Sequence, residues 1–513
     1  MLPLDVVIMA AGKGTRMKSK TPKVLQTLGG RPLLGHVLQA AVALSARKIV
    51  LITGHEAELV QLGATQMFEQ EFPVQTKIES TSKTVPAALE FALQMPQLGT
   101  GHAIQQALPH LSDDGLTLVL SGDVPLTQVK TLQGLINASW EYGQDSGNAA
   151  LSLLTLNTET PFGYGRVLRG NSSQGDTHSS TKVTPQSHAN ANSEVIGIVE
   201  EKDASAEQKL ITEVYTGVLV APTKHLRTWV NSLDNKNAQG EYYLTDVVKK
   251  AVETGVPIKT LSIHNAVEVM GVNSPAQLAE LERAFQRMNA NSLMEQGVRF
   301  KDPNRFDVRG ELLCAEDVEI DVNSVFTGRV TLGRDVYIGP NCVISNAVIE
   351  DGVRIEAFTH IEGESASLPV VVGTNARVGP YARLRPGAVL GADVHVGNFV
   401  EIKNSTLADG AKANHLAYVG DASLGERVNF GAGAITANYD GVNKHRTLIE
   451  SDVHVGSNSV LVAPVTIGAG GTIGAGSTIT KSTESGALSI TRAKQLSVQN
   501  WTRPQKNQAK KVN

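Results

Sequence analysis

A glycine-rich loop with basic side chains follows the first apolar run of the chain. It lies within "VVIMAAGKGTRM", residues 6–17, and a further basic side chain comes soon after; the glycines and cations are Gly12, Lys13, Gly14, Arg16 and Lys23. Glycine lets a backbone approach a ligand closely, and free N–H groups beside Lys and Arg can neutralise a triphosphate. A P-loop would need Gly at Val7, and a dinucleotide fingerprint would need Gly at Met17. By itself the loop could also be an ordinary turn between a strand and a helix.

A carboxylate follows another apolar run, "LTLVLSGDVP" at 116–125. Asp123 in this position suits Mg²⁺, which prefers few carboxylate ligands together with phosphate oxygens. A lone strand-end aspartate could equally form a turn or cap a helix. Nucleotidyl transfer needs no protein nucleophile, because positioning and charge stabilisation can do most of the work.

A third candidate lies in "ADGAKANHLAYVGD", residues 408–421, where His415 interrupts small and apolar residues. An imidazole with an ordinary pKa near 6.5 can take a proton from an amine, as an N-acetyl transfer requires. A lone histidine could also be an ordinary surface residue. The nearby segment "GAITANYDGVNKHR", 433–446, breaks the rhythm of its surroundings and is expected to be a loop that can reach a neighbour.

The elements that must position the first two candidates have an α/β pattern. Short apolar runs predict strands of a buried parallel sheet: "DVVIMAAG", "KIVLITGHE", "LTLVLSGDVP" and "AALSLLTL". Helix-like segments such as "LLGHVLQAAVALSA" and "GHAIQQALPHL" lie between them. This alternation favours a doubly wound, Rossmann-like domain that binds ligands at the carboxyl ends of its strands.

Residues 170–194 interrupt this pattern with a polar stretch rich in Ser, Thr, Asn and Gln, which we expect to be a flexible insertion. The flanking segments "GYGRVLR" and "VIGIVEEKDA" could pair across it as a hairpin. After the α/β half, Ser274 can cap a helix that begins at Pro275, and Gln277 could complete a capping box. One stripe of this connecting helix is apolar: Leu278, Leu281, Phe285 and Met288.

The rhythm changes to a period of six after about residue 300. Apolar residues six apart are Leu332, Ile338 and Ile344; Val372, Val378, Leu384, Leu390, Val396 and Ile402; and Val455, Leu461, Ile467, Ile473 and Ile479. A helix needs a period of 3.6 and an ordinary strand a period of 2. The hexapeptide period predicts a β-helix of short parallel strands, with these side chains pointing inward.

Composition narrows the class of protein. The chain has 513 residues and a net charge of −4, which argues against nucleic-acid binding by bulk charge. Two cysteines cannot build a disulfide framework, and no apolar run is long enough for a transmembrane helix. We therefore expect a cytoplasmic protein without membrane insertion. The tail from Arg492 has six basic and no acidic residues, so it is either a solvated end or an arm that docks on a neighbouring subunit or an anionic ligand.

Together these pieces resemble the signature of the sugar-1-phosphate nucleotidyltransferases. The segments that carry the resemblance are "GKGTRM" with Pro22-Lys23, "LGTGHA" at 98–103, "SGDVPL" at 121–126, "GYGR" at 163–166, "GIVEEKDA" at 197–204, "GEYYLTD" at 240–246 and "GVNS" at 271–274. With its hexapeptide half, nearly the whole chain resembles bacterial N-acetylglucosamine-1-phosphate uridyltransferases fused to glucosamine-1-phosphate N-acetyltransferases.

The resemblance implies a role for particular residues of the first half. The implied set is Asp123 and Asn273 for Mg²⁺; Gln94, Gly99 and Thr100 for uracil; Gly165 and Glu200 for the amino sugar; Lys13, Arg16 and Lys23 for phosphates; and Met9, Ala10, Ala11, Gly12, Ser121 and Gly122 for the rest of the UTP and UDP-N-acetylglucosamine site. The family usually has Asn before the Thr-Gly of "EVYTG", where this chain has Tyr215. A backbone contact or an altered loop could replace that sugar contact.

The same resemblance implies an acetyltransferase site in the second half. His415 would be the catalytic base, and the other implied residues are Arg385, Lys403, Tyr418 and Asn429 for glucosamine 1-phosphate, and Ala432, Asn438, Tyr439, Ser457, Ala475 and Arg492 for acetyl-CoA. Small residues also pack tightly in any β-helix, so the residues themselves leave that alternative open.

The organisation that follows has four parts. They are a uridyltransferase domain at 1–273, a linker helix at 274–299, a left-handed β-helix at 300–490 and a basic arm at 491–513. The family resemblance implies acetylation of glucosamine 1-phosphate, uridylyl transfer from UTP to N-acetylglucosamine 1-phosphate, and a homotrimer. Two alternatives stay open: a single-activity nucleotidyltransferase with a structural or regulatory β-helix, and a non-catalytic scaffold. UTP in place of dTTP rests on the resemblance alone.

Overall fold

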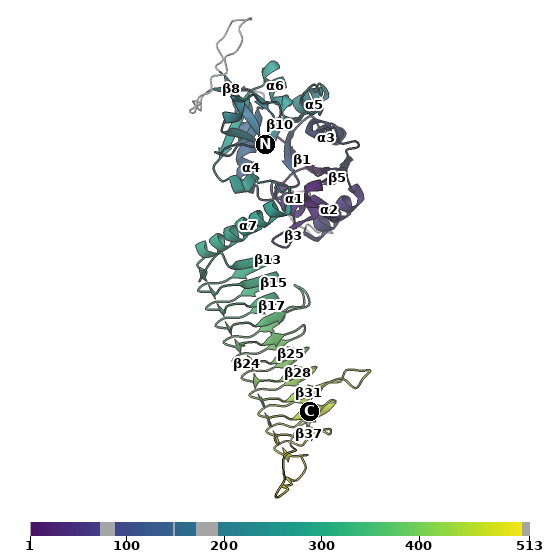
Figure 1. Ribbon diagram of the computed structural model, residues 1–513, viewed down its shortest axis with the longest axis vertical. Helices are drawn as coiled ribbons and strands as arrows, with labels where there is room; N and C mark the ends of the chain where they lie inside the picture. Colours follow the sequence, from purple (N-terminus) through teal and green to yellow (C-terminus); the bar gives the residue numbers. More distant parts are fainter. Residues whose placement is uncertain (1, 72–87, 147–148, 171–192, 505–513) are drawn as a thin grey trace, which may run out of the picture. The chain divides into compact units, whose positions relative to one another are not determined.

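A computed structural model describes residues 2–71, 88–146, 149–170 and 193–504 (Figure 1). The chain divides into two compact units, one ending at Met288 and the other beginning at Asn289. Most of the expected insertion at 170–194 and the end of the basic arm lie outside the described residues. Within these ranges, no helix is long and apolar enough to cross a membrane.

The first unit is built on a nine-stranded sheet with the main order β11-β7-β10-β6-β1-β4-β5. Its strands are β1 (Leu4–Met9), β4 (Lys48–Thr53), β5 (Ala88–Leu93), β6 (Leu116–Ser121), β7 (Leu151–Asn157), β8 (Gly165–Gly170), β9 (Glu194–Val199), β10 (Glu213–Pro222) and β11 (Ile258–Ile263), with a small separate hairpin of β2 (Thr27–Leu28) and β3 (Arg31–Pro32). The four predicted apolar runs are β1, β4, β6 and β7, and all four run in the same direction.

The prediction of a purely parallel sheet is wrong at β10, which lies between β6 and β7 and is antiparallel to both. Parallel neighbours need a crossover connection, usually a helix, whereas β10 is reached from β9 through 200–212, where the only helix is a short 3₁₀ turn at Gln208–Leu210. The predicted hairpin is confirmed, because β8 and β9 pair antiparallel.

Helices cover both faces of this sheet (Figure 1). Val6 and Ile8 of β1 pack in one buried layer with α1 (Leu33–Ala43), α2 (Ala57–Glu71) and α4 (Val129–Ser146). Val7 faces the opposite layer, with α3 (Thr100–Ala107), α5 (Thr223–Asn231) and α6 (Asp246–Glu253). Fully burying an aliphatic side chain contributes about 1.5–3 kcal/mol, so these strands anchor the sheet and leave the loops at their carboxyl ends free for a site.

Helix α7 (Pro275–Glu295) begins at the predicted residue. Its apolar stripe packs with Met17, Leu28, Leu33, Leu126 and Val272 of the first unit. Farther along, Ala290 and Leu293 belong to the core of the second unit. The helix is therefore held by apolar contacts along its length.

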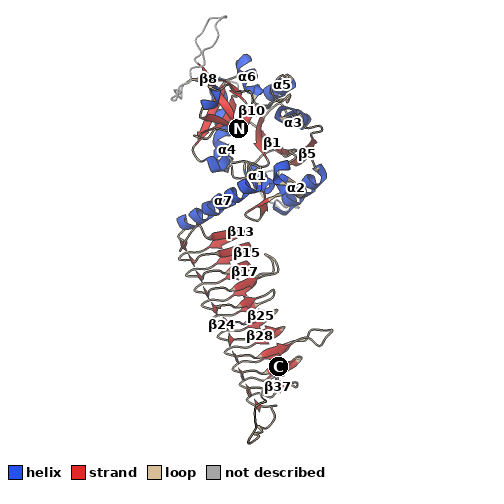
Figure 2. Cartoon of the chain, viewed as in Figure 1, coloured by secondary structure: helices blue, strands red, loops and turns tan. Residues whose placement is uncertain are grey.

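The second unit is a parallel β-helix. Figure 2 shows it as short strands joined by loops. One face is an eleven-stranded sheet of β12 (Arg299–Phe300), β14 (Glu319–Ile320), β16 (Tyr337–Ile338), β18 (Arg354–Ile355), β21 (Arg377–Val378), β24 (His395–Asn398), β27 (Lys412–His415), β30 (Asn429–Phe430), β33 (His454–Val455), β36 (Thr472–Ile473) and β38 (Leu488–Ser489).

A 16-stranded sheet supplies the other two faces, because the two halves of β17 (Val343–Ile349) pair with different strands. The longer strands at the start are β13 (Phe306–Cys314) and β15 (Ser324–Leu332). One face continues through β19 (His360–Glu362), β22 (Arg383–Leu384), β25 (Glu401–Lys403), β28 (Tyr418–Gly420), β31 (Ile435–Ala437), β34 (Val460–Val462) and β37 (Thr478–Ile479). The other continues through β20 (Val370–Val372), β23 (Val389–Leu390), β26 (Thr406–Leu407), β29 (Ala422–Leu424), β32 (Thr447–Ile449) and β35 (Val465–Ile467).

The predicted six-residue period is confirmed in this core. Every apolar residue of the predicted hexads is at most 3% exposed, and all belong to one buried cluster. A turn at each corner lets the next strand point its central side chain inward, so a period of six lines the interior of the coil.

Candidate functional sites

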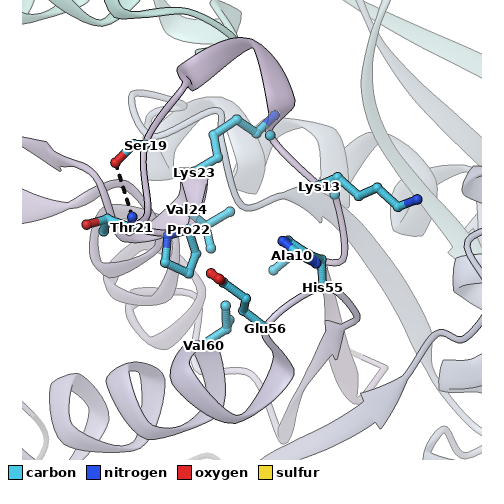
Figure 3. Close-up of a pocket in the computed structure, with 12 residues that line it drawn as sticks. Ala10, Lys13, Ser19, Thr21, Pro22, Lys23, Val24, His55, Glu56 and Val60 are labelled. Carbon is cyan, nitrogen blue, oxygen red and sulfur yellow. Dashed lines mark hydrogen bonds between the residues drawn. The ribbon is translucent and has the colours of Figure 1, made fainter.

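The glycine-rich loop is shaped by a left-handed residue at Gly14, which has φ 59°. A Cβ added there would lie 2.8 Å from the Cβ of Lys23, so glycine is needed both for the backbone angle and for this close approach. Figure 3 shows the pocket that results. The loop supplies Lys13 and Lys23, and His55 and Glu56 reach the pocket from the segment before α2.

Four predicted residues meet at the carboxyl ends of the strands. Lys23 Nζ donates to Asp123 Oδ2, and to Asn273 Oδ1 at 3.2 Å. Arg16 Nη2 donates to the same Asn273 oxygen at 2.9 Å. The side chains of Lys23 and Asp123 are only 13% and 14% exposed, so solvent screens their attraction weakly. Residues separated by up to 257 positions are thus joined in one charged cluster.

The oxygens of this cluster are suitable for a hard cation. Asp123 Oδ2 and Asn273 Oδ1 converge on one ammonium group, and Ser121 Oγ holds the other carboxylate oxygen at 2.6 Å. Mg²⁺ accepts such oxygen donors and completes its shell with water and phosphate. In the described part of the chain, no group of three or more His, Cys, Asp and Glu side chains could hold a metal. A cation here would therefore depend on oxygens from a bound substrate.

The start of α7 fixes the position of Asn273. Ser274 Oγ accepts from the Gln277 N–H at 3.3 Å, as expected for a helix cap. The predicted capping box differs by one residue, because the Gln277 side chain accepts from the Asn273 N–H at 2.8 Å. The backbone of Val272 also donates to the Asp123 carbonyl at 3.0 Å, so both oxygen donors are tied to the same backbone framework.

The predicted uracil residues form a second group around the start of α3. Gln94 is buried and donates through Nε2 to the Gly99 carbonyl at 2.9 Å. Gly99 has φ 108°, and an added Cβ would lie 2.6 Å from the Tyr242 carbonyl oxygen. Thr100 Oγ1 accepts from the Leu244 N–H at 3.0 Å. A planar edge could therefore lie against backbone here with no side chain in the way.

The predicted sugar residues are close to this group. Thr245 Oγ1 donates to Glu200 Oε1 at 2.9 Å, so the segment "GEYYLTD" joins the two groups. An added Cβ at Gly165 would lie 3.8 Å from the Glu200 carboxyl carbon, which makes the two residues neighbours. Burial raises the pKa of Glu200, and the Thr245 hydrogen bond opposes this shift. Glu200 is thus a half-buried acceptor whose charge costs desolvation energy.

Tyr215 lies beside Gly165 in the sheet, because β10 and β8 pair at these two residues. Its side chain is 7% exposed, and its hydroxyl has no hydrogen-bond partner. Burial raises its pKa, with a smaller contribution from the charge of Glu200. The ring fills space under the sugar residues, and the hydroxyl is an unsatisfied polar group there.

In the second unit, His415 ends β27, and Asn398 ends the neighbouring strand β24 in register with it. The His415 Nδ1 lies 2.9 Å from Asn398 Oδ1. An amide oxygen can only accept, so Nδ1 carries the proton in this pair and Nε2 is left as the basic nitrogen. Asn398 was not predicted from the sequence, although it precedes His415 by 17 residues, the length of one coil.

Three cations gather next to this pair. The Arg385 guanidinium donates to Glu401 at 2.8 Å, and Lys403 ends the same strand β25. Burial and the charges of Lys444 and Arg385 lower the pKa of Lys403, and its side chain also interacts with Lys444. Like charges this close oppose one another unless an anion lies between them, so the arrangement fits a phosphate. Lys444 was not predicted, because it lies on the loop that leaves the coil.

That loop is a structured hairpin. Asp440 accepts hydrogen bonds from the backbone N–H groups of Val442 and Asn443 at 2.8 and 2.6 Å, and its other oxygen lies 2.7 Å from His445 Nε2. These bonds hold the pKa of Asp440 well below its usual range. At the base, Asn438 Nδ2 donates to Asp421, while Tyr439 is 61% exposed. The predicted Asn438-Tyr439 pair is thus presented on a preformed support.

The remaining predicted residues follow one edge of the β-helix. Asn458 N donates to the Ala432 carbonyl at 2.8 Å, and Gly476 N donates to the Ser457 carbonyl at 2.8 Å, which stacks this edge coil on coil. Arg492 Nη1 donates to the Ala475 carbonyl at 2.7 Å. Tyr418 lies against Gly420, where an added Cβ would be 2.4 Å from the tyrosine oxygen, and Asn429 is exposed on the next coil. Small side chains therefore line an open edge that ends at a guanidinium.

Comparisons with known proteins agree with both halves. The MobA-like NTP transferase domain matches residues 6–152, and the bacterial transferase hexapeptide (six repeats) matches 369–404 and 446–481. The "Bifunctional protein GlmU" of Polaromonas sp. is 58% identical over 504 residues and covers 98% of each chain. Those of Acidovorax ebreus and Albidiferax ferrireducens are 55% and 56% identical, cover 99% and 98% of this chain, and are themselves covered to 99% and 100%.

Proposed function

Because this chain belongs to the family of bifunctional GlmU proteins, we propose that it catalyses two consecutive steps in UDP-N-acetylglucosamine synthesis. Its left-handed β-helix transfers an acetyl group to glucosamine 1-phosphate. Its α/β unit then transfers a uridylyl group to the resulting N-acetylglucosamine 1-phosphate and releases pyrophosphate. The two units carry two separate constellations, which supports two reactions in one chain.

The observation that carries the uridylyl transfer is the meeting of Asp123 and Asn273 oxygens at Lys23. The phosphate oxygen of the sugar attacks the α-phosphorus of UTP, and the bond to pyrophosphate breaks. Asp123 and Asn273 would hold Mg²⁺, which neutralises charge on the triphosphate. Lys13, Arg16 and Lys23 supply further positive charge, and the bared backbone at Gly12 and Gly14 brings N–H groups to the phosphates.

The base and the sugar bind farther along the strand ends. Gln94 and the backbone around Gly99 and Thr100 would bind the uracil edge, because a side chain at Gly99 would collide with Tyr242. Glu200 would accept hydrogen bonds from the amino sugar over Gly165. These contacts hold the sugar phosphate in position for in-line attack.

The observation that carries the acetyl transfer is the His415–Asn398 pair beside three cations. Arg385, Lys403 and Lys444 would bind the phosphate of glucosamine 1-phosphate, with Tyr418 and Asn429 against the sugar. His415 Nε2 takes a proton from the amine as its nitrogen attacks the thioester carbonyl of acetyl-CoA. The carbon–sulfur bond then breaks, and the CoA thiolate leaves.

Acetyl-CoA would lie along the edge formed by Ala432, Ser457 and Ala475. The small side chains leave room for the extended pantetheine arm, and Arg492 at the end of the edge can bind a CoA phosphate. The exposed Tyr439 lies on the loop that flanks this edge.

A homotrimer is proposed from exposed apolar surface on the β-helix. Phe358, Tyr381 and Phe399 stack on one another at 4.9 and 5.3 Å, Leu416 belongs to the same row, and all four are 47–63% exposed. In the described tail, Leu496, Val498 and Trp501 are also exposed. Two further copies would cover both surfaces. Tyr381→Glu with Phe399→Glu should give monomers in light scattering after gel filtration; an unchanged mass would rule out this row as the contact.

Two single variants of the full chain test the bifunctional assignment. Asp123→Ala should abolish uridylyl transfer and keep acetyl transfer, because it removes the only carboxylate of the cluster around Lys23. His415→Ala should lower acetyl transfer by roughly 10²–10⁴-fold and keep uridylyl transfer. Each activity is measured with its own substrates, UTP with N-acetylglucosamine 1-phosphate and Mg²⁺, or acetyl-CoA with glucosamine 1-phosphate.

The pattern of losses decides between the alternatives. A chain without acetyl transfer before any substitution would be a single-activity nucleotidyltransferase. Loss of both activities in one variant would indicate misfolding, which circular dichroism detects. Reciprocal loss is the result expected of two independent active sites.

A further inference from the structure

A buried carboxylate lies at the base of the loop that carries Asn438 and Tyr439. The Asp421 side chain is 6% exposed, and each of its oxygens accepts from an asparagine amide. Oδ1 accepts from Asn404 Nδ2 at 2.5 Å, and Oδ2 accepts from Asn438 Nδ2. Burying a carboxylate is costly unless its oxygens are hydrogen-bonded, so this position is built for a specific contact.

The backbone of Asp421 joins the same parts of the site. Its N–H donates to the Lys403 carbonyl at 3.1 Å, and its carbonyl accepts from the Thr447 N–H at 3.1 Å. Thr447 begins the first strand after the loop, and Asn438 lies at the loop's start. One residue therefore ties both ends of the loop to the strand that carries Lys403, and its charge also favours the charged form of Lys403.

The contact fixes which way the Asn438 amide faces. A carboxylate can only accept, so the NH₂ group of Asn438 must point to Asp421 and its carbonyl oxygen must point away. Resting on the acetyl transfer proposed above, we propose that Asp421 is a positioning residue that presents the Asn438 oxygen as an acceptor to an N–H group in the acetyl-transfer site. That donor is the amine of the sugar or an amide of pantetheine.

An isosteric change would reverse this orientation. In Asp421→Asn, the new amide oxygen still accepts from Asn404, so its NH₂ group faces Asn438. Two NH₂ groups cannot pair, and Asn438 must rotate to offer its oxygen to residue 421. The substrate N–H then meets a donor in place of an acceptor. Asn438→Asp repairs the polarity in the double variant, because a carboxylate accepts on both sides and the total charge equals that of the original pair.

The experiment measures kcat and KM of acetyl transfer in the full chain for Asp421→Asn, Asn438→Asp and the double variant. Each single variant should lose roughly tenfold to a hundredfold in kcat/KM, and the double variant should recover most of that loss. If the acceptor serves the amine, the loss falls on kcat and on KM for glucosamine 1-phosphate. If it serves pantetheine, the loss falls on KM for acetyl-CoA and on its binding in calorimetry.

A matched control is Asp393→Asn. Asp393 is another β-helix corner residue with positive φ, 56° against 47° for Asp421, but it is exposed. It should leave acetyl transfer unchanged, and uridylyl transfer should be unchanged in all of these variants. A normal kcat/KM in Asp421→Asn would overturn the proposal, and so would a double variant no better than the single ones. Absence of acetyl transfer in the unsubstituted chain would instead refute the proposed function, whatever the variants do.

Discussion

The two units of this chain build their sites in opposite ways. In the α/β unit, Arg16, Lys23, Asp123 and Asn273 come from separate loops, and each loop follows a different strand or helix. In the β-helix, side chains one coil apart in the sequence become neighbours. Asn398 and His415, and likewise Asn404, Asp421 and Asn438, are separated by 17 residues and are in direct contact.

This difference determines what each site tolerates. A loop at the end of a strand can change length while the sheet beneath it keeps its register, because closing a longer loop costs little. A coil cannot, because one extra residue exchanges inward and outward side chains. The β-helix accommodates its extra residues only where they leave the coil, as in the loop 438–446: Asn429 pairs with His454, 25 residues later.

The largest expected effect comes from changing the length of one coil. One glycine inserted after Gly410 would turn Ala413 outward and the Lys412 ammonium inward, against the core. We expect acetyl transfer to be lost and the free energy of unfolding to fall by about 3 kcal/mol or more, measured by urea denaturation. One glycine inserted after Gly255, in the turn between α6 and β11, should cost about 1 kcal/mol or less and keep uridylyl transfer. Equal costs for the two insertions would contradict the comparison.

A second test concerns the cation that the loop adds to the site. Lys444→Met should raise KM for glucosamine 1-phosphate by roughly tenfold to a hundredfold, because one of three phosphate-binding charges is lost. KM for acetyl-CoA should change little. Lys481→Met, which alters an exposed lysine on a later coil, is the control. An unchanged KM for the sugar phosphate would mean that Lys444 does not reach it.

A smaller effect is expected from pH in the α/β unit. Because burial raises the pKa of Glu200 above its ordinary value of 4.5, this residue takes up a proton at a higher pH than an exposed glutamate does. The protonated form is a weaker acceptor for sugar hydroxyls, so KM for N-acetylglucosamine 1-phosphate should rise as pH falls into the mildly acidic range. Glu200→Gln should have a high KM that no longer varies with pH. A variant that keeps the original pH profile would assign the transition to another group.

The smallest effect concerns Tyr215, whose hydroxyl is buried without a partner. Tyr215→Phe removes an unsatisfied polar group and keeps the ring, so the free energy of unfolding should rise by about 1 kcal/mol. Uridylyl transfer should stay within roughly twofold. If KM for the sugar phosphate instead rose tenfold, the hydroxyl would be a sugar contact that replaces the asparagine usual at this position.

Much of the fold follows from periodicity, which is a local property of the sequence. The hexads predict a β-helix, since each inward side chain is set by its place in its own coil, and all of them are buried. The apolar runs likewise predict β1, β4, β6 and β7. The antiparallel course of β10 was missed, because strand direction depends on the connection and on the neighbours, which a single run does not contain.

The site divides in the same way. Residue types and spacing by themselves marked the phosphate loop, a strand-end Asp123 and an isolated His415 as candidates for chemistry. Their partners depend on distance in space. The cluster of Arg16, Lys23, Asp123 and Asn273 needs the sheet order and the start of α7, and Lys444 needs the path of a loop outside the coils.

Asn398 and Asp421 lie between these cases. A spacing of 17 residues was present in the sequence, but it has meaning only once the length of that coil is known. Sequence alone therefore determined which residues could carry charge or a proton and which had to be buried, since those are properties of side chains and of local period. Only the tertiary structure decided which of them meet, because hydrogen bonds and ion pairs require atoms within about 3 Å.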